Sequence, residues 1–233
     1  MAHPYENKHV VITGGIGGLG EAVVSAFVDA GAMVHVPNFF DAVPDSFPFA
    51  SHPQVSVTNG VDLSDESAVA AFYASVGEVW ASIHLAGGFA MAPVTETSLD
   101  EFMKMFNRNA VTCFLSCREA VRAIRKSGDG GRIVNVGARP AMAAVGGMIG
   151  YSTAKASVIA ITQSLAVELV DEQIWVNAIA PSIIDTPTNR EAMPDADFEK
   201  WPKPAQLATV ILFLASPENQ VTTGSLVPVY GLA

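Results

Sequence analysis

Basic residues and long apolar runs are scarce in this chain, which has 13 Lys and Arg against 23 Asp and Glu and a formal net charge of −10. Nucleic acids and anionic membranes are bound by clustered Lys and Arg, so this balance disfavours both as partners. The most apolar helical stretch, near 156–170, is short and contains Glu168, which argues against a membrane span. We therefore expect no nucleic-acid partner and no membrane association.

Cysteine is rare as well: Cys113 and Cys117 lie four residues apart on one predicted helix. Neighbouring helical turns rarely satisfy disulfide geometry, so we interpret both thiols as small buried or interface groups. Reduced cysteines and the lack of a signal-peptide pattern predict a cytoplasmic protein. The histidines show no ligand spacing, and no metal site is predicted. They are His3, His9, His35, His52 and His84.

Strand-like apolar runs alternate with helical patterns along the 233 residues. Strands are expected at 8–13, 33–37, 54–60, 80–88, 131–137, 174–180 and 225–230, and helices at 19–31, 65–76, 99–126, 151–169 and 204–215. The alternation predicts an α/β fold, a doubly wound, Rossmann-like parallel sheet of about seven strands with helices on both faces. We expect a single domain, with a cofactor half of about 1–130 and a catalytic half of about 131–233. The proline-rich crossover at 38–53 is expected to be a loop or a single turn.

A glycine-rich turn, TGGIGGLG, follows the first strand and opens the first helix. It fits G-x-G-x-x-G from Gly15 or the looser G-x-x-x-G-x-G from Gly14. In both cases small residues let the backbone approach a pyrophosphate at a helix N-terminus. A methyltransferase would also place such a turn here, so the turn alone leaves the reaction open. The candidate contacts are Gly14, Gly15, Gly17, Gly18, Leu19 and Gly20.

The end of the second strand bears on the choice of cofactor. NAD sites commonly place an acid there, whereas this chain has Asn38, and Asp41 is a poor substitute by position. No Arg or Lys occurs between Gly14 and Asp41 to bind a 2′-phosphate. The sequence therefore favours NAD(H) over NADP(H).

Tyr151 and Lys155 stand four residues apart on a predicted helix and share a face. A phenol titrates near pKa ~10, and a neighbouring ammonium is expected to lower that pKa. Tyr151 is then a proton donor or acceptor. Such a pair alone is commonly a surface feature, but together with the glycine turn it predicts hydride chemistry.

These motifs together resemble the short-chain dehydrogenase/reductase family over the full chain. The resemblance implies that Asp62, followed by Leu63, caps the adenine and that Asn109 supports a proton relay. The family's N-A-G turn is altered to Leu85-Ala86-Gly87, followed by Gly88. Its P-G after strand six becomes Pro181-Ser182. By the same resemblance, Ile184 and Thr186 face the nicotinamide carboxamide.

One departure concerns position 138, where the family has a serine and this chain has Ala138. Loss of one oriented donor costs roughly 2.7–4 kcal/mol of barrier when the substrate oxygen gains charge. The stretches at 86–88, 147–155 and 186–201 resemble dihydropteridine reductase, a short family member that also lacks this serine. That resemblance implies a quinonoid dihydropterin-like substrate, which needs a proton donor more than a polarised carbonyl.

Flat apolar and aromatic side chains suit a flat heterocyclic substrate. The candidate lining residues are Phe89, Met91, Arg139, Met142, Met148, Met193 and Trp201. Arg139 is interpreted in two ways. It either binds an acidic group of the substrate or partly replaces the missing serine donor, or it is a solvated charge on a loop. By family resemblance the loop at 187–203 covers the substrate.

Three functional hypotheses stay open: a reductase of a quinonoid substrate, a carbonyl or alcohol enzyme with the serine replaced, and a catalytically silent dinucleotide-binding regulator. The helix at 99–126 carries more apolar surface than one sheet face needs, which predicts a homodimer or homotetramer. Its apolar residues are Phe102, Met103, Phe106, Val111, Phe114 and Leu115.

Overall fold

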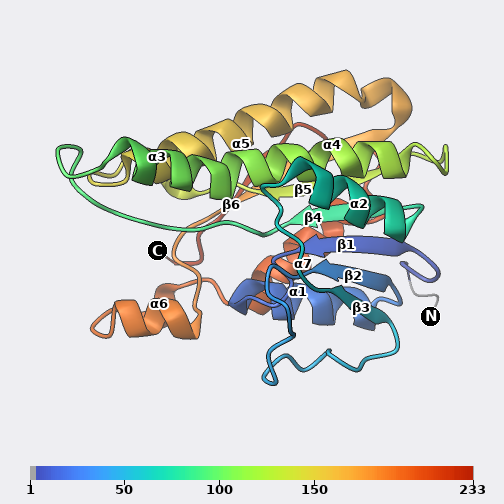
Figure 1. The fold of residues 1–233 in the computed structure, drawn as a ribbon, viewed down its shortest axis with the longest axis horizontal. Helices are drawn as coiled ribbons and strands as arrows, with labels where there is room; N and C mark the ends of the chain where they lie inside the picture. Colours follow the sequence, from blue (N-terminus) through green and yellow to red (C-terminus); the bar gives the residue numbers. More distant parts are fainter. Residues whose placement is uncertain (1–3, 233) are drawn as a thin grey trace.

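A computed structural model describes residues 4–232, so His3 lies outside the described residues (Figure 1). Seven parallel strands form one sheet in the order β3-β2-β1-β4-β5-β6-β7, which confirms the Rossmann-like prediction. The strands are β1 (His9–Thr13), β2 (Met33–Pro37), β3 (Val55–Thr58), β4 (Ala81–His84), β5 (Gly131–Val136), β6 (Ile174–Pro181) and β7 (Leu226–Val229).

Helices cover both faces of this sheet. The helices are α1 (Gly18–Asp29), α2 (Glu66–Val76), α3 (Leu99–Phe106), α4 (Thr112–Ile124), α5 (Ile149–Glu168), α6 (Pro187–Ala192) and α7 (Pro204–Ala215). In Figure 1, α2, α3, α4 and α5 lie above the sheet and α1 and α7 below it, while α6 projects from one end. Within residues 4–232, no helix combines the length and the apolarity that crossing a membrane requires.

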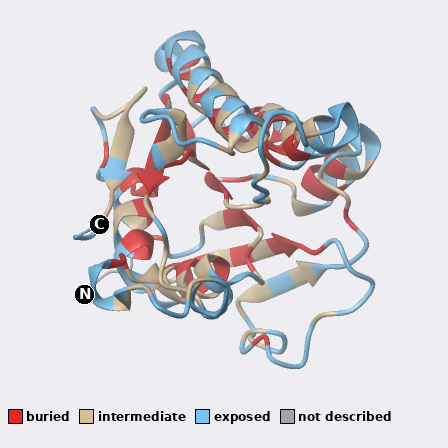
Figure 2. Ribbon diagram, turned by 90° about the vertical axis from the view of Figure 1, so that its left-hand side faces the viewer, coloured by how far each residue is buried: buried red, intermediate tan, exposed pale blue. Residues whose placement is uncertain are grey.

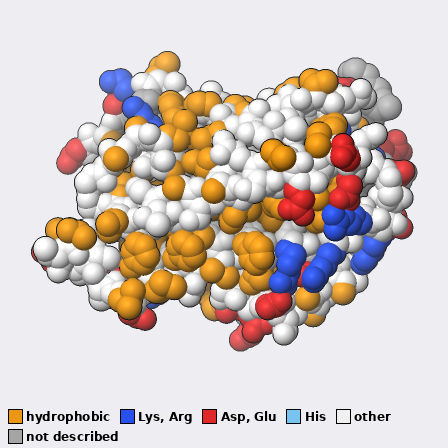
Figure 3. Space-filling model, turned by 90° about the horizontal axis from the view of Figure 1, so that it is seen from above, with side chains coloured by type: hydrophobic (Ala, Val, Ile, Leu, Met, Phe, Trp, Pro, Cys, Tyr) orange, Lys and Arg blue, Asp and Glu red, His pale blue; other side chains and the backbone are white. Residues whose placement is uncertain are grey.

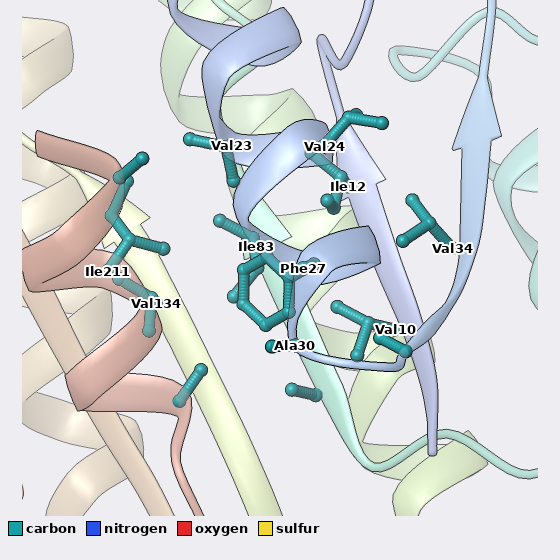
Figure 4. Packing of buried hydrophobic residues seen from close by; sticks show 14 of the residues in the cluster. Val10, Ile12, Val23, Val24, Phe27, Ala30, Val34, Ile83, Val134 and Ile211 are labelled. Atoms are coloured by element: carbon teal, nitrogen blue, oxygen red, sulfur yellow. The ribbon is translucent and has the colours of Figure 1, made fainter. Parts of the chain in front are cut away.

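The core consists of two apolar layers because the central strands are buried on both sides. Figure 2 shows the buried residues gathered in the strands and on the helix sides that face them. In the lower layer, Phe27 of α1 and Ile211 of α7 pack with Ile83 of β4 (Figure 4). The upper layer joins α2, α4 and α5 through residues such as Phe72, Leu115 and Val158.

The strand order reverses between β1 and β4. From there the chain builds outward to β3 on one side and to β7 on the other. Crossovers leave in opposite directions at such a point, so a crevice opens beyond the carboxyl ends of the two strands. The glycine turn after β1 and the altered N-A-G turn after β4 both lie at this crevice.

The predicted helix at 99–126 differs most from the observed structure. A π-helical turn, Asn107–Val111, separates α3 from α4. The physical reason is visible at Asn109, whose Nδ2 donates to the Met105 carbonyl oxygen at 3.0 Å and competes for a helical acceptor. Two smaller differences concern β4, which ends at His84 rather than at 88, and the expected loop at 187–203, which contains α6. The crossover at 38–53 contains no helix, as predicted.

Candidate active site

The turn between β1 and α1 requires glycine at two positions. Gly14 has φ +69°, and an added Cβ would lie 2.8 Å from the Ala86 nitrogen. A Cβ on Gly20 would lie 2.1 Å from the Gly14 carbonyl oxygen. The N-cap residue, Gly17, provides no side-chain cap, so the first N–H groups of α1 stay free for an anion.

A groove of about 790 Å³ runs along this turn and across the crevice. Seven of the predicted cofactor residues line it: Gly14, Gly17, Asn38, Asp62, Leu63, Ala86 and Gly87. Gly15 and Gly20 lie buried beneath the turn. A cradle that any side chain would fill, next to free N–H groups, fits a dinucleotide pyrophosphate.

The remaining predicted cofactor residues lie outside that lining. Thr186 is nevertheless close to the turn, since a Cβ on Gly18 would lie 3.1 Å from its Cγ2. Ile184 packs against the lower core layer, and Pro181 ends β6. Leu19 also packs against the lower layer. Gly88 follows Gly87 in the turn after β4.

Asn38 closes the other end of the groove. Its Nδ2 donates to the Phe40 carbonyl oxygen at 3.2 Å, the Ala42 carbonyl oxygen at 3.0 Å and Asn59 Oδ1 at 2.8 Å. The side chain is thereby committed to holding the loop after β2. The groove residues between 37 and 64 include no basic side chain.

Tyr151 and Lys155 both lie in the first half of α5, with the Lys155 Nζ 6.0 Å from the Tyr151 ring centre. Lys155 Nζ donates to the Val136 carbonyl oxygen at 2.8 Å. Burial raises the pKa of Tyr151 to about 12 and lowers the pKa of Lys155 to about 8. The expectation that Lys155 lowers the phenol pKa is therefore wrong for this structure. Burial of the phenol raises its pKa by more than the Lys155 ammonium could lower it, because the ammonium points toward the Val136 carbonyl oxygen.

Asn109 is buried in the π-helical turn and holds the backbone after β4. Its Nδ2 donates to the Gly88 carbonyl oxygen at 3.0 Å, and its Oδ1 accepts from the Gly88 N–H at 3.2 Å. A Cβ on Gly87 would lie 2.6 Å from that Oδ1. Asn109 thus fixes the wall between the groove and Tyr151.

Next to Tyr151 lies a second cavity of about 220 Å³. Phe89 contacts the tyrosine edge-on, with ring centres 5.0 Å apart, and Met91 also lines the cavity. Ala138, 3% exposed, lies two residues after β5, outside both linings, and carries a methyl group at the position where the resemblance implies a hydroxyl. We call this second space the tyrosine cavity.

Other predicted substrate residues are placed differently. Trp201 is only 5% exposed, packs on Phe198 with ring centres 5.0 Å apart, and lines neither cavity. The Arg139 guanidinium stacks over Tyr230 at 5.0 Å, outside both linings. Their residue types suited a substrate, but an aromatic partner occupies each of them. The three remaining methionines, Met142, Met148 and Met193, lie outside the two linings as well.

The segment around α6 is held by one carboxylate. Asp185, whose side chain is 6% exposed, pairs with Arg190 at 2.5 Å and with Lys203 at 2.8 Å. Arg190, and to a lesser degree Lys203, holds the pKa of Asp185 well below its usual range. Asp185, which follows β6, therefore holds both ends of the segment at 187–203 that is predicted to cover the substrate.

Sequence reasoning missed a buried polar network beneath the site. His84 bonds Asn135 Oδ1 through Nδ1 at 2.7 Å and Ser82 Oγ through Nε2 at 2.8 Å. The ligand atoms of His84, Cys113 and Cys117 lie within 4.8 Å of one another, although their sequence spacing gave no such signal. Because hydrogen bonds already occupy both ring nitrogens, we assign the network a structural role.

Lys155 gives the protein a pH-dependent stability that can be measured. Its pKa is lower in the folded chain, so the unfolded chain binds more protons between about pH 8 and 10.5. This group's contribution to the free energy of unfolding should therefore rise with pH in that window, by at most about 1.4 kcal/mol per pH unit. Denaturant unfolding of the parent and of Lys155→Met should show a parent-minus-variant difference that grows from pH 8 to 10.5. A difference independent of pH would contradict the assignment.

Comparison with known proteins agrees with this geometry. The short-chain dehydrogenase family matches residues 8–197. The chain is 28% identical to the 2,5-dichloro-2,5-cyclohexadiene-1,4-diol dehydrogenase LinX of Sphingobium indicum, covering 99% of this chain and 98% of that protein. It is 27% identical to the 3-oxoacyl-(acyl-carrier-protein) reductase MabA of Mycobacterium tuberculosis, covering 98% and 93%.

Among solved structures, ElxO with NADP bound superposes with a TM-score of 0.89 at 27% identity, covering 97% of this chain and 98% of that one. A variant of the same protein with NADPH bound gives the same TM-score at 26% identity. None of these relatives is a pterin reductase by name. The matched family, the sheet order and the groove together show that this chain belongs to the short-chain dehydrogenase/reductase family and is an NAD(P)-dependent oxidoreductase.

Proposed function

We propose that this enzyme reduces a flat quinonoid heterocycle of the dihydropterin type. The observation that carries the proposal is Ala138, a buried methyl group at the end of β5 where related enzymes have a serine hydroxyl. A carbonyl substrate loses a hydrogen-bond donor there, whereas a quinonoid ring regains aromaticity on accepting hydride and needs mainly a proton. Phe89, which contacts Tyr151 edge-on, and Met91, which lines the same cavity, offer apolar surface that suits a flat ring.

A bound NADH supplies the hydride in this reaction. Tyr151, protonated at neutral pH because its pKa is about 12, donates the accompanying proton to a ring nitrogen. Lys155, held by the Val136 carbonyl oxygen, lies with its Nζ 6.0 Å from the Tyr151 ring centre, where its charge opposes but does not cancel the effect of burial on the phenol pKa. Asn109 keeps the Gly87–Gly88 backbone in position between the two cavities.

NADH is the proposed cofactor because the groove offers a 2′-phosphate no cation at its β2 end. Asn38, although it is not an acid, keeps the loop after β2 folded close to the strand. The NADP-bound structure of ElxO supports a nicotinamide dinucleotide in the groove of this fold and is compatible with either NADH or NADPH in this chain. The Kd values of NADH and NADPH, measured by fluorescence, decide this preference.

A carbonyl or alcohol substrate is the second candidate. LinX, by its name a diol dehydrogenase, and MabA, by its name a 3-oxoacyl reductase, align over nearly the whole chain and favour it. In this case another group has to act at the substrate oxygen in place of the serine. Arg139 would have to leave its stacking position on Tyr230 to do so.

An assay with purified protein separates the two candidates. Absorbance of NADH is followed with quinonoid dihydropterin, with simple ketones and with a 3-oxoacyl thioester. Turnover of the pterin at least about a hundredfold faster than that of the ketones supports the proposal, since this is the size of effect expected for one lost oxyanion donor. Efficient ketone or thioester reduction without pterin reduction would overturn it.

We also propose that the enzyme is a homodimer or homotetramer. Phe114 of α4 is 49% exposed and lines neither cavity, whereas Met103 of α3, 42% exposed, lines the cofactor groove, and Leu115, predicted as surface, is buried in the chain. Figure 3 looks onto this helical side and shows hydrophobic side chains spread over it, with charged groups toward its edges and most of them on the right of the view. Sedimentation should show more than one chain per particle, and Phe114→Glu should shift the distribution toward the monomer. A parent protein that sediments as a monomer would end this proposal.

A further inference from the structure

The wall between the groove and the tyrosine cavity carries two cations, Lys104 and Arg108, that line both spaces. We propose that Arg108, assisted by Lys104, binds an anionic group of the substrate, such as a carboxylate, a sulfonate or a phosphate. This inference rests on the proposed role of the tyrosine cavity as the substrate site. It adds an acidic substituent to the substrate class.

These two side chains are the exceptions in an acidic protein. Within residues 4–232, all but two of the 13 Lys and Arg side chains make a hydrogen bond, an ion pair or a close aromatic contact, and only Lys104 and Arg108 make none. The partnered residues are Lys8, Arg118, Arg122, Arg125, Lys126, Arg132, Arg139, Lys155, Arg190, Lys200 and Lys203. A chain with a net charge of −10 thus leaves its two unpaired cations together at the site.

The π-helical turn and a glycine position Arg108. Gly88 has no side chain, and an added Cβ there would lie 3.2 Å from Arg108 Cδ and 3.6 Å from its Nη1. The arginine therefore lies against the Gly88 backbone, which Asn109 holds through two hydrogen bonds. Its guanidinium stands where the two spaces meet, and its fork of N–H donors matches the oxygens of a carboxylate or phosphate.

The acidic residues nearby form no ion pair with this wall, although hydrogen bonds from Ser98 and, to a lesser degree, the charge of Lys104 lower the pKa of Glu101. Glu101 also lines the tyrosine cavity, but its carboxylate accepts from Ser98 N–H and Ser98 Oγ, both at 2.9 Å, in a capping box. Asp100 lines the groove. Within the described chain neither forms an ion pair with Lys104 or Arg108, so both cations stay available to a ligand.

The test compares ligands that differ by one charge. Two matched pairs are used, pterin with pterin-6-carboxylate and methyl benzoylformate with benzoylformate, one pair for each candidate substrate class. Kd is measured for each ligand with the enzyme–NAD⁺ complex, for the parent, Arg108→Gln, Lys104→Gln and the control Lys126→Gln. Lys126 is an exposed lysine in the turn after α4 that lines neither cavity, and its replacement changes the net charge by the same amount.

We expect the parent to bind the anionic member of at least one pair about tenfold or more tightly than the neutral member. Arg108→Gln should bring that ratio close to one, Lys104→Gln should reduce it partly, and Lys126→Gln should keep it. The parent ratio should also fall as salt is raised.

Several results would overturn the inference. They are a parent ratio near one in both pairs, equal ratios in Arg108→Gln and Lys126→Gln, and no binding of any of the four ligands. A rise in the NADH Kd of Arg108→Gln with an unchanged ratio would assign the cations to the cofactor and would also overturn it. A charge preference confined to the benzoylformate pair, with no reduction of quinonoid dihydropterin, would reject the pterin proposal and leave the anion site intact.

Discussion

Replacement of Tyr151 by phenylalanine is expected to reduce kcat by about a hundredfold to ten-thousandfold. Two of the residues that line the tyrosine cavity carry a hydroxyl, Tyr151 and Thr97. Of these two, Tyr151 is the one that contacts Phe89. The ring itself stays in place in the variant, so the edge-on contact with Phe89 is preserved. Steady-state turnover of the best substrate and the Kd of NADH are the two measurements.

The NADH Kd separates a chemical effect from a structural one. It should stay within about threefold of the parent value, because the phenol hydroxyl donates to the substrate. Tyr230→Phe serves as the matched control, since it removes a tyrosine hydroxyl that, within residues 4–232, donates to Met142 sulfur alone, at 3.7 Å, and it should keep full turnover. Undiminished kcat in Tyr151→Phe would mean that the proton comes from another group.

Introduction of a serine at Ala138 should raise kcat/KM for simple ketones by about 10²–10³. The position lies two residues after β5 and is buried, so a hydroxyl there is shielded from water, and in related enzymes the serine at this position faces the substrate oxygen. Reduction of a quinonoid dihydropterin should change much less, because its ring needs no second donor. Kinetics of Ala138→Ser with both substrate types measure the difference.

The matched control is Ala141→Ser, which makes the same chemical change three residues along, in the short 3₁₀ turn that follows. It should leave ketone reduction at the parent level. If Ala138→Ser, folded and binding NADH normally, leaves ketone reduction equally unchanged, then the missing serine is not what limits carbonyl chemistry in this enzyme.

The fold followed from sequence patterns because each element had a local cause. Apolar runs such as 33–37 and 204–215 match their observed bounds, since a short apolar run after a glycine favours a strand and a longer apolar run that starts at a proline favours a helix. The strand order itself was known only from the structure. The doubly wound arrangement followed from the alternation of strands and helices and from right-handed crossovers. The π-helical turn did not, because it depends on the Asn109 side chain bonding a carbonyl one turn earlier.

The site was predictable where a motif fixes the backbone and unpredictable where tertiary contacts decide. Gly14 and Gly20 serve the turn as expected, and Tyr151 and Lys155 share a helix face. The pKa of Tyr151 went the other way, because burial is not visible in a spacing of four residues. Trp201 lies outside both linings because it packs on Phe198, a contact that the sequence does not reveal.

Lys104 and Arg108 belong to no recognised sequence motif, although their position just before Asn109 could be seen in the sequence. Both precede Asn109 on the predicted helix at 99–126, in a chain poor in Lys and Arg. What the sequence could not show is that every other cation has a partner. That property depends on the whole fold, and it sets these two apart only once all the ion pairs are known.

The hydrogen bonds of Asn38 restrict how cofactor choice can change in this lineage. One amide nitrogen serves three oxygen acceptors, two of them in the loop that follows β2. Aspartate at this position would present an oxygen to those same three oxygens, and the loop would have to open before a ribose hydroxyl was reached. A carboxylate for adenosine recognition therefore has to arrive together with a remodelled segment 38–42, and a point mutation alone takes the protein through a less stable intermediate.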